Sequence, residues 1–192
     1  MALMLVGLLI FLGVHSVRVF ANGWRARTIA RIGEGPWKGA YSLLSLAGFV
    51  MIVWGFGLAR QQPVLLWQPP SGMRHLAALL VLLAFIGVAA AYVPGNMIRA
   101  RLHHPMVLGV KTWAVAHLLA NGTLADVLLF GSFLLWAVLS FIAARRRDRV
   151  DNTVYRPGTL APTVVTLLVG AAAWAGFAFW LHAAWIGVRP FG

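Results

Sequence analysis

Six histidines are the residues best able to do chemistry in a chain of 192 residues that is otherwise largely apolar. His15 stands inside the apolar run from Leu3 to Phe20. An ionisable side chain at membrane depth is costly, so it usually faces the interior of a helix bundle or a functional pocket. Two interpretations of His15 are therefore open: a ligand of a buried metal or cofactor, and a histidine bonded to the backbone of a neighbouring helix.

The other residue types exclude several kinds of site. The chain has no cysteine, which excludes disulfides, thiolate ligands and a cysteine nucleophile. No His-x-x-x-His or Glu-x-x-His spacing occurs, and Asp126 is the only acidic residue in the apolar segments. Zinc and di-iron carboxylate sites are therefore not indicated. Two imidazoles from separate helices in an apolar slot would suit a haem, whose iron takes axial histidines.

Lys111 and Tyr41 are the candidate catalytic residues. Lys111 follows His104 by two helical turns, which places both on nearly the same face. Its ammonium could pair with a haem propionate or a substrate carbonyl, or it could extend to the membrane interface with its stem packed. Tyr41 begins a stripe of small or polar residues that predicts a helix contact surface or one wall of a pocket. The other members of the stripe are Ser45, Gly48, Ile52 and Gly55.

Membrane-spanning helices must position these residues. The chain is 61% hydrophobic and only 10% charged, which is not the composition of a soluble domain. Apolar segments near the roughly 20 residues that a helix needs to cross the hydrocarbon core recur along it. They cover residues 2–21, 40–59, 75–93, 105–119 (which is short), 124–144 and 163–186. The sequence predicts an all-α, polytopic membrane protein: one domain, 1–192, with a bundle of about six transmembrane helices.

The placement of charge indicates a membrane topology rather than nucleic-acid binding. The formal net charge is +12, and the basic residues gather in the first, third and fifth loops between the apolar segments. These residues are Arg25, Arg27, Arg31, Lys38, Arg99, Arg101, Arg145, Arg146, Arg147, Arg149 and Arg156. The positive-inside rule puts those loops in the cytoplasm and both termini outside. The expected partner is the lipid bilayer, with anionic headgroups near the basic loops.

This topology divides the histidines between the two halves of the bilayer. The cytoplasmic half holds His15, His103 and His104, and the outer half holds His75, His117 and His182. His15 with His104 or His103 could therefore face each other across two helices. His104 and His117 lie about 20 Å apart along an ideal helix, so one iron could not take both.

Local signals predict some of the helix boundaries. Pro36 and Pro105 suit first turns, where a missing N–H costs nothing. Thr123 with Asp126 resembles a reciprocal capping arrangement at the start of the fifth apolar segment. The Gly- and Ala-rich sixth segment, including Gly170, indicates a helix that packs closely against a neighbour.

Four segments resemble the NnrU family of integral membrane proteins. They are Leu-Gly-Val-His-Ser-Val-Arg at 12–18, Gly-Glu-Gly-Pro-Trp-Lys-Gly-Ala-Tyr-Ser-Leu-Leu-Ser-Leu at 33–46, Tyr-Val-Pro-Gly-Asn at 92–96, and the stretch 104–122 that runs from His-Pro-Met-Val-Leu-Gly to Leu-Leu-Ala-Asn-Gly. The resemblance covers almost the whole chain. It implies a single NnrU-like transmembrane domain in the inner (cytoplasmic) membrane of a bacterium.

The resemblance also implies haem chemistry. The family is named for its association with nitrite and nitric oxide reductase expression in denitrifying bacteria. Its plant relatives are the 15-cis-zeta-carotene isomerases, which use haem b with histidine ligands and depend on the redox state of the iron. Carried over residue by residue, this places the iron ligands on His15 and His104, with His117 as the alternative second ligand. A cysteine ligand considered for the plant relatives has no counterpart here.

Three functions follow as alternatives. The first is a haem-dependent cis–trans isomerase of a polyene or other isoprenoid lipid, which would be a hydrophobic small-molecule substrate. The second is a haem-bearing accessory or sensor protein of nitrite and nitric oxide metabolism. The third is a structural membrane protein without a cofactor. A visible spectrum separates the third from the others, and product analysis with cis-polyenes separates the first from the second.

The topology is testable with reporter fusions. A reporter at the C-terminus should report an external location, and one inserted within Arg145–Arg149 should report a cytoplasmic location, because the basic loops stay inside. A C-terminal reporter found in the cytoplasm would overturn the predicted topology.

Overall fold

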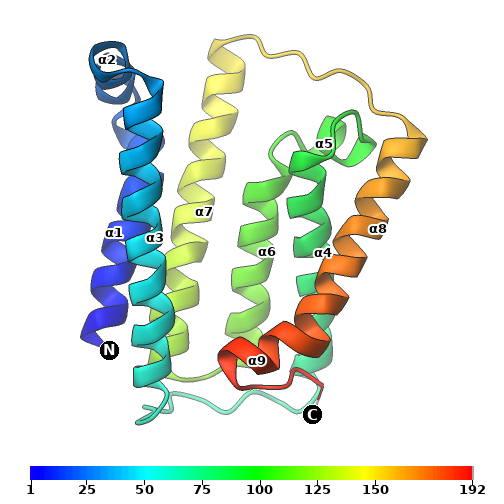
Figure 1. Ribbon diagram of the computed structural model, residues 1–192. Helices are drawn as coiled ribbons and strands as arrows, with labels where there is room; N and C mark the ends of the chain where they lie inside the picture. Colours follow the sequence, from blue (N-terminus) through cyan, green and yellow to red (C-terminus); the bar gives the residue numbers. More distant parts are fainter. Residues whose placement is uncertain (192) are drawn as a thin grey trace. The chain divides into compact units, whose positions relative to one another are not determined.

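A computed structural model of the protein describes residues 1–191, and these residues fold into helices (Figure 1). Within them, five helical stretches are long and apolar enough to cross a membrane, and one shorter apolar helix accompanies them. The five are α1 (Ala2–Phe20), α3 (Glu34–Ala59), α4 (Met73–Tyr92), α7 (Leu124–Val150) and the stretch Leu160–Ile186; the shorter one is α6 (Pro105–Ala120). The predicted class of polytopic helical membrane protein is confirmed. The fourth apolar segment is short in the structure as well.

The chain forms two compact units. The first consists of Met1–Leu66 with Thr123–Ser132, and the second consists of Trp67–Gly122 with the chain from Phe133 onward. Helix α7 therefore begins in the first unit and continues in the second. The last apolar stretch, in the second unit, is composed of α8 (Leu160–Gly176), a π-helical turn η1 (Phe177–Leu181) and α9 (His182–Ile186). The π-helical turn was not predicted from the sequence.

In the first unit, α1 and α3 pack with their backbones in contact. A Cβ atom on Gly55 would lie 2.3 Å from the backbone nitrogen of Met4, and one on Gly7 would lie 2.7 Å from that of Ile52. Gly48 meets the backbone of Phe11 in the same way. Small residues permit such close approach between transmembrane helices. The stripe that begins at Tyr41 is therefore a helix contact surface, as one of its two interpretations predicted.

A helix occupies much of the segment between the first two spans, where the charge pattern predicted a loop. Helix α2 covers Asn22–Ile32, and α3 begins directly afterwards at Glu34. Ala and Arg, which recur in α2, are good helix formers, so its basic character did not exclude a helix. Gly33, with φ of +87°, separates the two helices. The loop prediction was wrong because it considered charge and not helix propensity.

In the second unit, α4 packs along both α6 and α8. A Cβ on Gly109 of α6 would lie 2.8 Å from the carbonyl oxygen of Ala84, and one on Gly170 of α8 would lie 2.7 Å from the Cα of Ile86. Gly87 of α4 faces α6 through a similar contact with Pro105. The close-packing role predicted for Gly170 is confirmed.

Asn96 joins three segments of the second unit at one buried point. Its side chain is 1% exposed and caps the short helix α5 (Met97–Leu102) by accepting a bond from the Arg99 amide at 2.7 Å. Its Nδ2 donates to the Ala90 carbonyl at 2.9 Å, which ties the cap to the end of α4. The backbone of Gly158 packs against Asn96, since a Cβ there would lie 2.3 Å from the Asn96 carbonyl carbon. Asn96 thus fixes where the α7–α8 connection returns to α4 and α5.

The ends of α7 show one confirmed and one wrong prediction. At its start, the Thr123 hydroxyl donates to Asp126 at 2.6 Å and accepts from the Asp126 amide at 3.3 Å, so the predicted capping arrangement is confirmed. At its end, the helix continues to Val150, whereas the sequence placed a loop after residue 144. Arg145–Arg149 therefore lie on helical turns, and this gives their side chains fixed directions.

Substituting Gly55 tests the α1–α3 contact. Gly55→Ala should lower the free energy of unfolding by about 2 kcal/mol, because the new methyl group would meet the Met4 backbone. SDS titration of the purified protein in mixed micelles measures this. Gly57→Ala is the matched control on the same helix, since no atom lies within 4 Å of a Cβ at that position. Equal midpoints for the two variants would contradict the contact.

Candidate functional site

His15 lies among aromatic rings between α1 and α3. Its Nδ1 is 2.7 Å from the backbone oxygen of Phe11, one turn earlier on α1. A carbonyl oxygen can only accept, so Nδ1 carries the proton and, in the neutral ring, the lone pair is on Nε2. The ring stacks on Phe11 with centroids 4.2 Å apart, and the Tyr41 ring centroid is 5.2 Å away. A metal-binding histidine usually donates one ring N–H to a carbonyl or carboxylate and binds the metal through the other nitrogen. The bond from Nδ1 to Phe11 therefore makes His15 suitable as an axial haem ligand.

The aromatic contacts of His15 continue to the outward face of α3. Phe11 contacts Phe49, with ring centroids 6.3 Å apart. Phe49 also lines a shallow hollow of about 370 Å³ whose other walls are Val50, Val53 and Trp54. These four side chains are all exposed and apolar. An apolar molecule in this hollow would contact Phe49, whose ring contacts Phe11, the residue that stacks on His15.

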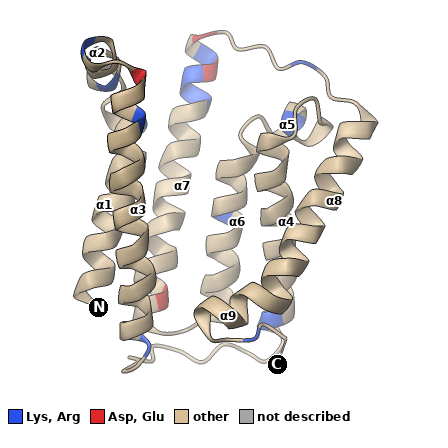
Figure 2. Ribbon diagram, in the orientation of Figure 1, with Lys and Arg blue, Asp and Glu red and all other residues tan. Residues whose placement is uncertain are grey.

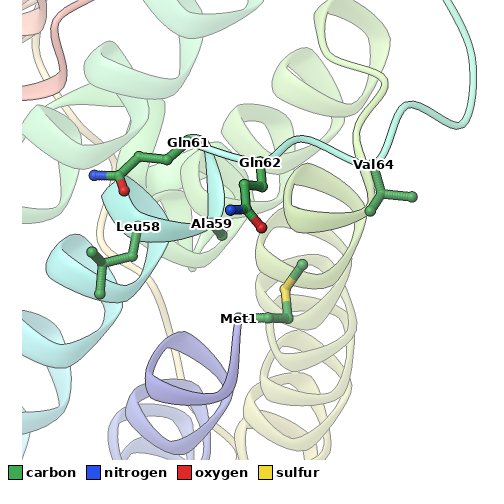
Figure 3. Close-up of a pocket in the computed structure, with 6 residues that line it drawn as sticks. All are labelled: Met1, Leu58, Ala59, Gln61, Gln62 and Val64. Carbon is green, nitrogen blue, oxygen red and sulfur yellow. The ribbon is translucent and has the colours of Figure 1, made fainter.

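A second cavity of about 390 Å³ lies where α3 ends (Figure 3). It is lined by Met1, Leu58, Ala59, Gln61, Gln62 and Val64. The two glutamine amides are its polar groups besides the N-terminus. Neither this cavity nor the hollow on α3 is lined by a histidine.

His104 is part of a polar cluster in the second unit. Its Nε2 donates to Oδ2 of Asp148 at 2.8 Å, and Oη of Tyr155 donates to Oδ1 of the same carboxylate at 3.0 Å. The Arg145 guanidinium lies 3.5 Å from Oδ2. The side chains of His104 and Asp148 are only 20% and 14% exposed. Because its Nε2 is engaged in this ion pair, His104 does not fit an axial ligand in this arrangement: iron would have to displace Asp148 or bind Nδ1.

His103 belongs to the same cluster but not to α6. Its backbone has φ of +63°, in the link between α5 and α6. Its ring stacks flat on Tyr155, with centroids 4.0 Å apart and 8° between the planes, and its Nδ1 accepts a bond from Arg145. Helix α6 begins at Pro105, as the sequence predicted, so His103 lies outside it. His103 and His104 together hold the α7–α8 connection against the start of α6.

Burial and the carboxylate of Asp148 change the pKa of Tyr155 in this cluster. Burial raises the pKa of the Tyr155 phenol, and its bond to Asp148 and the charge of that carboxylate raise it further. Tyr155 therefore remains a hydrogen-bond donor throughout the physiological pH range. Figure 2 shows the acidic and basic residues alternating at the end of α7.

Lys111 is the one lysine or arginine in α6, and it lies near the middle of the helix. Its Nζ lies 5.7 Å from the centroid of the Phe141 ring on α7, and the His104 ring meets the same ring edge-on at 6.2 Å. The predicted common face of His104 and Lys111 is thus confirmed. A cation–π contact contributes about 0.5–2 kcal/mol, whereas a lysine at the centre of a membrane helix costs about 2.5–3.5 kcal/mol. The contact with the Phe141 ring is therefore weaker than the free-energy cost of placing the lysine charge in the membrane.

His117 resembles His15 in its bonding. Its Nδ1 lies 2.9 Å from the carbonyl oxygen of Trp113, so that nitrogen carries the proton and the lone pair is on Nε2. His182 has an equivalent bond from Nδ1 to the Val188 oxygen at 2.7 Å. His75 is exposed at the start of α4.

The structure brings some predicted residues together and separates others between the units. His15 and Tyr41 are neighbours in the first unit, and His104 and Lys111 share Phe141 in the second. Within residues 1–191, no group of three or more His, Asp or Glu side chains could hold a metal ion. Sequence reasoning missed Asp148, Tyr155 and Phe141. The short connection at residues 121–123 was the available signal, because a connection of this length makes α6 and α7 antiparallel.

Comparison with known proteins gave one match. The family model described as "NnrU protein" matches residues 3–190. No curated protein and no solved structure matches the chain.

Replacing Asp148 tests the cluster. Asp148→Asn should lower the free energy of unfolding by about 2 kcal/mol, because it removes the charge that pairs with His104 and Arg145 in a mostly buried position. Thermal unfolding in detergent, followed by circular dichroism, measures the change. Asp151→Asn, in the exposed connection just beyond α7, should leave the midpoint unchanged. The same loss in both variants would count against a specific role for Asp148.

Proposed function

Since the chain belongs to the NnrU family, we propose that it is a haem b-binding membrane protein and a cis–trans isomerase of a polyene or other isoprenoid lipid. One observation carries the haem proposal. The Nδ1–H of His15 donates to Phe11, which directs the lone pair to Nε2 in a half-buried aromatic setting. An apolar, aromatic environment around a histidine is what a porphyrin ring favours.

The residues around His15 orient it and exclude water. Phe11 supplies both the carbonyl that fixes the tautomer and a ring that holds the imidazole by stacking. Tyr41 closes another side, and its hydroxyl is the nearest group in this aromatic set that can hold or release a proton. When bound, haem would supply a redox-active iron that could take a double bond or nitric oxide once one of its histidine ligands has dissociated.

The proposed substrate class rests on the face of α3. The hollow at Phe49 is apolar and lined by exposed side chains, and Phe49 contacts the ring that stacks on His15. Its volume of about 370 Å³ falls in the range of small-molecule pockets. A polyene dissolved in the bilayer could reach it without crossing a polar layer. Tyr41 and Lys111 are the proposed catalytic residues, on the first and second units respectively.

Two histidines are candidates for the second axial ligand, and their imidazole rings make different hydrogen bonds. His104 was the first choice from the resemblance, but its Nε2 donates to Asp148. His117, the alternative, has the same Nδ1–H to carbonyl bond as His15. The hydrogen bonds of the rings therefore favour His117, whereas the predicted topology, which places His117 in the opposite half of the bilayer from His15, favours His104.

Haem content of the variants tests these assignments. His15→Ala should abolish the Soret band of the purified protein, because the iron loses an axial nitrogen. Of His104→Ala and His117→Ala, the variant that removes the second ligand should shift or weaken the band, and the other should not. His75→Ala and His182→Ala are the controls and should keep the wild-type spectrum. Full haem with an unchanged spectrum in His15→Ala would overturn the assignment of His15, and wild-type spectra in both His104→Ala and His117→Ala would overturn the assignment of a second histidine ligand.

Product analysis tests the isomerase proposal. The haem-loaded protein in nanodiscs, given cis-zeta-carotene under reducing conditions, should yield the trans product, which chromatography separates. Tyr41→Phe should slow conversion about tenfold or more if its hydroxyl takes part, with haem content unchanged. An intact spectrum without conversion would leave the accessory or sensor function in nitrogen-oxide metabolism as the better proposal. If the wild-type protein bound no haem, both the isomerase proposal and the haem-bearing accessory or sensor proposal would be wrong.

A further inference from the structure

Lys111 is a cation at membrane depth without a counter-charge among residues 1–191. The contact described for its ammonium is the Phe141 ring. The ion pairs found in these residues involve other cations: Lys38 with Glu34, and His104 and Arg145 with Asp148.

The whole sequence offers few candidates for a partner. It contains four acidic side chains. Glu34 is held by Lys38 at 3.0 Å, Asp126 by Thr123 at 2.6 Å, and Asp148 by His104 at 2.8 Å. Asp151 lies exposed in the connection beyond α7. The acidic side chains are therefore committed elsewhere or lie outside the membrane.

The position of Lys111 also separates it from the polar end of its helix. It lies six residues after Pro105, about 9 Å along α6. Its ammonium lies 5.7 Å from the centroid of the Phe141 ring, and no ion pair joins it to the cluster at His104 among residues 1–191. Snorkelling would carry the charge to the interface and would need no partner. Since a single ring interaction is weaker than the cost of the charge, an anion bound at this depth would offset the remainder.

We propose that Lys111 binds the carboxylate of an amphiphilic ligand whose apolar part lies along α6 and α7. A single ammonium matches a single negative charge, which favours a carboxylate over a phosphate. Apolar surface along the same two helices comes from three aromatic rings: Phe141, Trp113 and Phe133. The ring centroids of Trp113 and Phe133 are 5.4 Å apart, and Phe141 is the ring that Lys111 contacts. Two sources have this chemistry: a free fatty acid, and a propionate of haem. The haem source rests on the function proposed above, and the fatty-acid source does not.

Paired acid and ester probes test the proposal on the full chain in non-ionic detergent. Oleate is compared with methyl oleate, and haem b with its dimethyl ester, because each pair differs only in the carboxylate charge. Wild-type protein should bind at least one acid about tenfold more tightly than its ester. Lys111→Met should lose that preference, and Lys111→Arg should retain most of it.

Lys38→Met is the matched control, since that lysine is 70% exposed and paired with Glu34. It should keep the wild-type preference. Discrimination in the oleate pair identifies a fatty acid, and discrimination in the haem pair identifies a propionate. A wild-type protein that binds acid and ester equally in both pairs overturns the proposal, whether or not Lys111→Met folds. A protein that binds no haem but prefers oleate would refute the proposed function and leave this inference standing.

Discussion

Close contact between helix backbones is the interaction on which this structure depends. Transmembrane helices gain little from hiding apolar surface, because lipid is as apolar as their side chains, so van der Waals packing must hold them together. Glycines at Gly7, Gly48 and Gly55 bring α1 against α3, and Gly87 and Gly109 bring α4 against α6. His15 and Tyr41 meet only because α1 and α3 approach this closely. The aromatic setting of the histidine is thus a consequence of glycine packing.

Polar side chains are few, and most are used to fasten connections. Asn96 and the Thr123–Asp126 pair close turns of the backbone, and Asp148 joins the α7–α8 connection to α6. In lipid, unsatisfied polar groups are costly, so each of these residues has a bonded partner. Lys111 differs from them because its partner within the described chain is an aromatic ring.

The sequence predicted the features that depend on composition and on neighbouring residues. Apolar length gave the helical membrane class, and the Thr123–Asp126 spacing gave the cap of α7. Helix α2 was missed because the charge of the segment was taken to indicate a loop, although its residues are good helix formers. The engagement of His104 by Asp148 was missed because it joins residues far apart in the sequence, and only the antiparallel arrangement of α6 and α7 brings them together. The tautomers of His15 and His117 likewise needed the positions of backbone carbonyls.

The π-helical turn at Phe177–Leu181 has a consequence for how relatives can vary. An extra residue in a regular α-helix would rotate everything after it by about 100°. A wider turn absorbs that residue locally, so that His182–Ile186 keep the facing they would have in a shorter, uninterrupted helix. Homologous chains can therefore gain or lose one residue at this point without disturbing either half of the helix. An alignment gap between Phe177 and Leu181 would thus mark a tolerated change in length rather than a change in architecture.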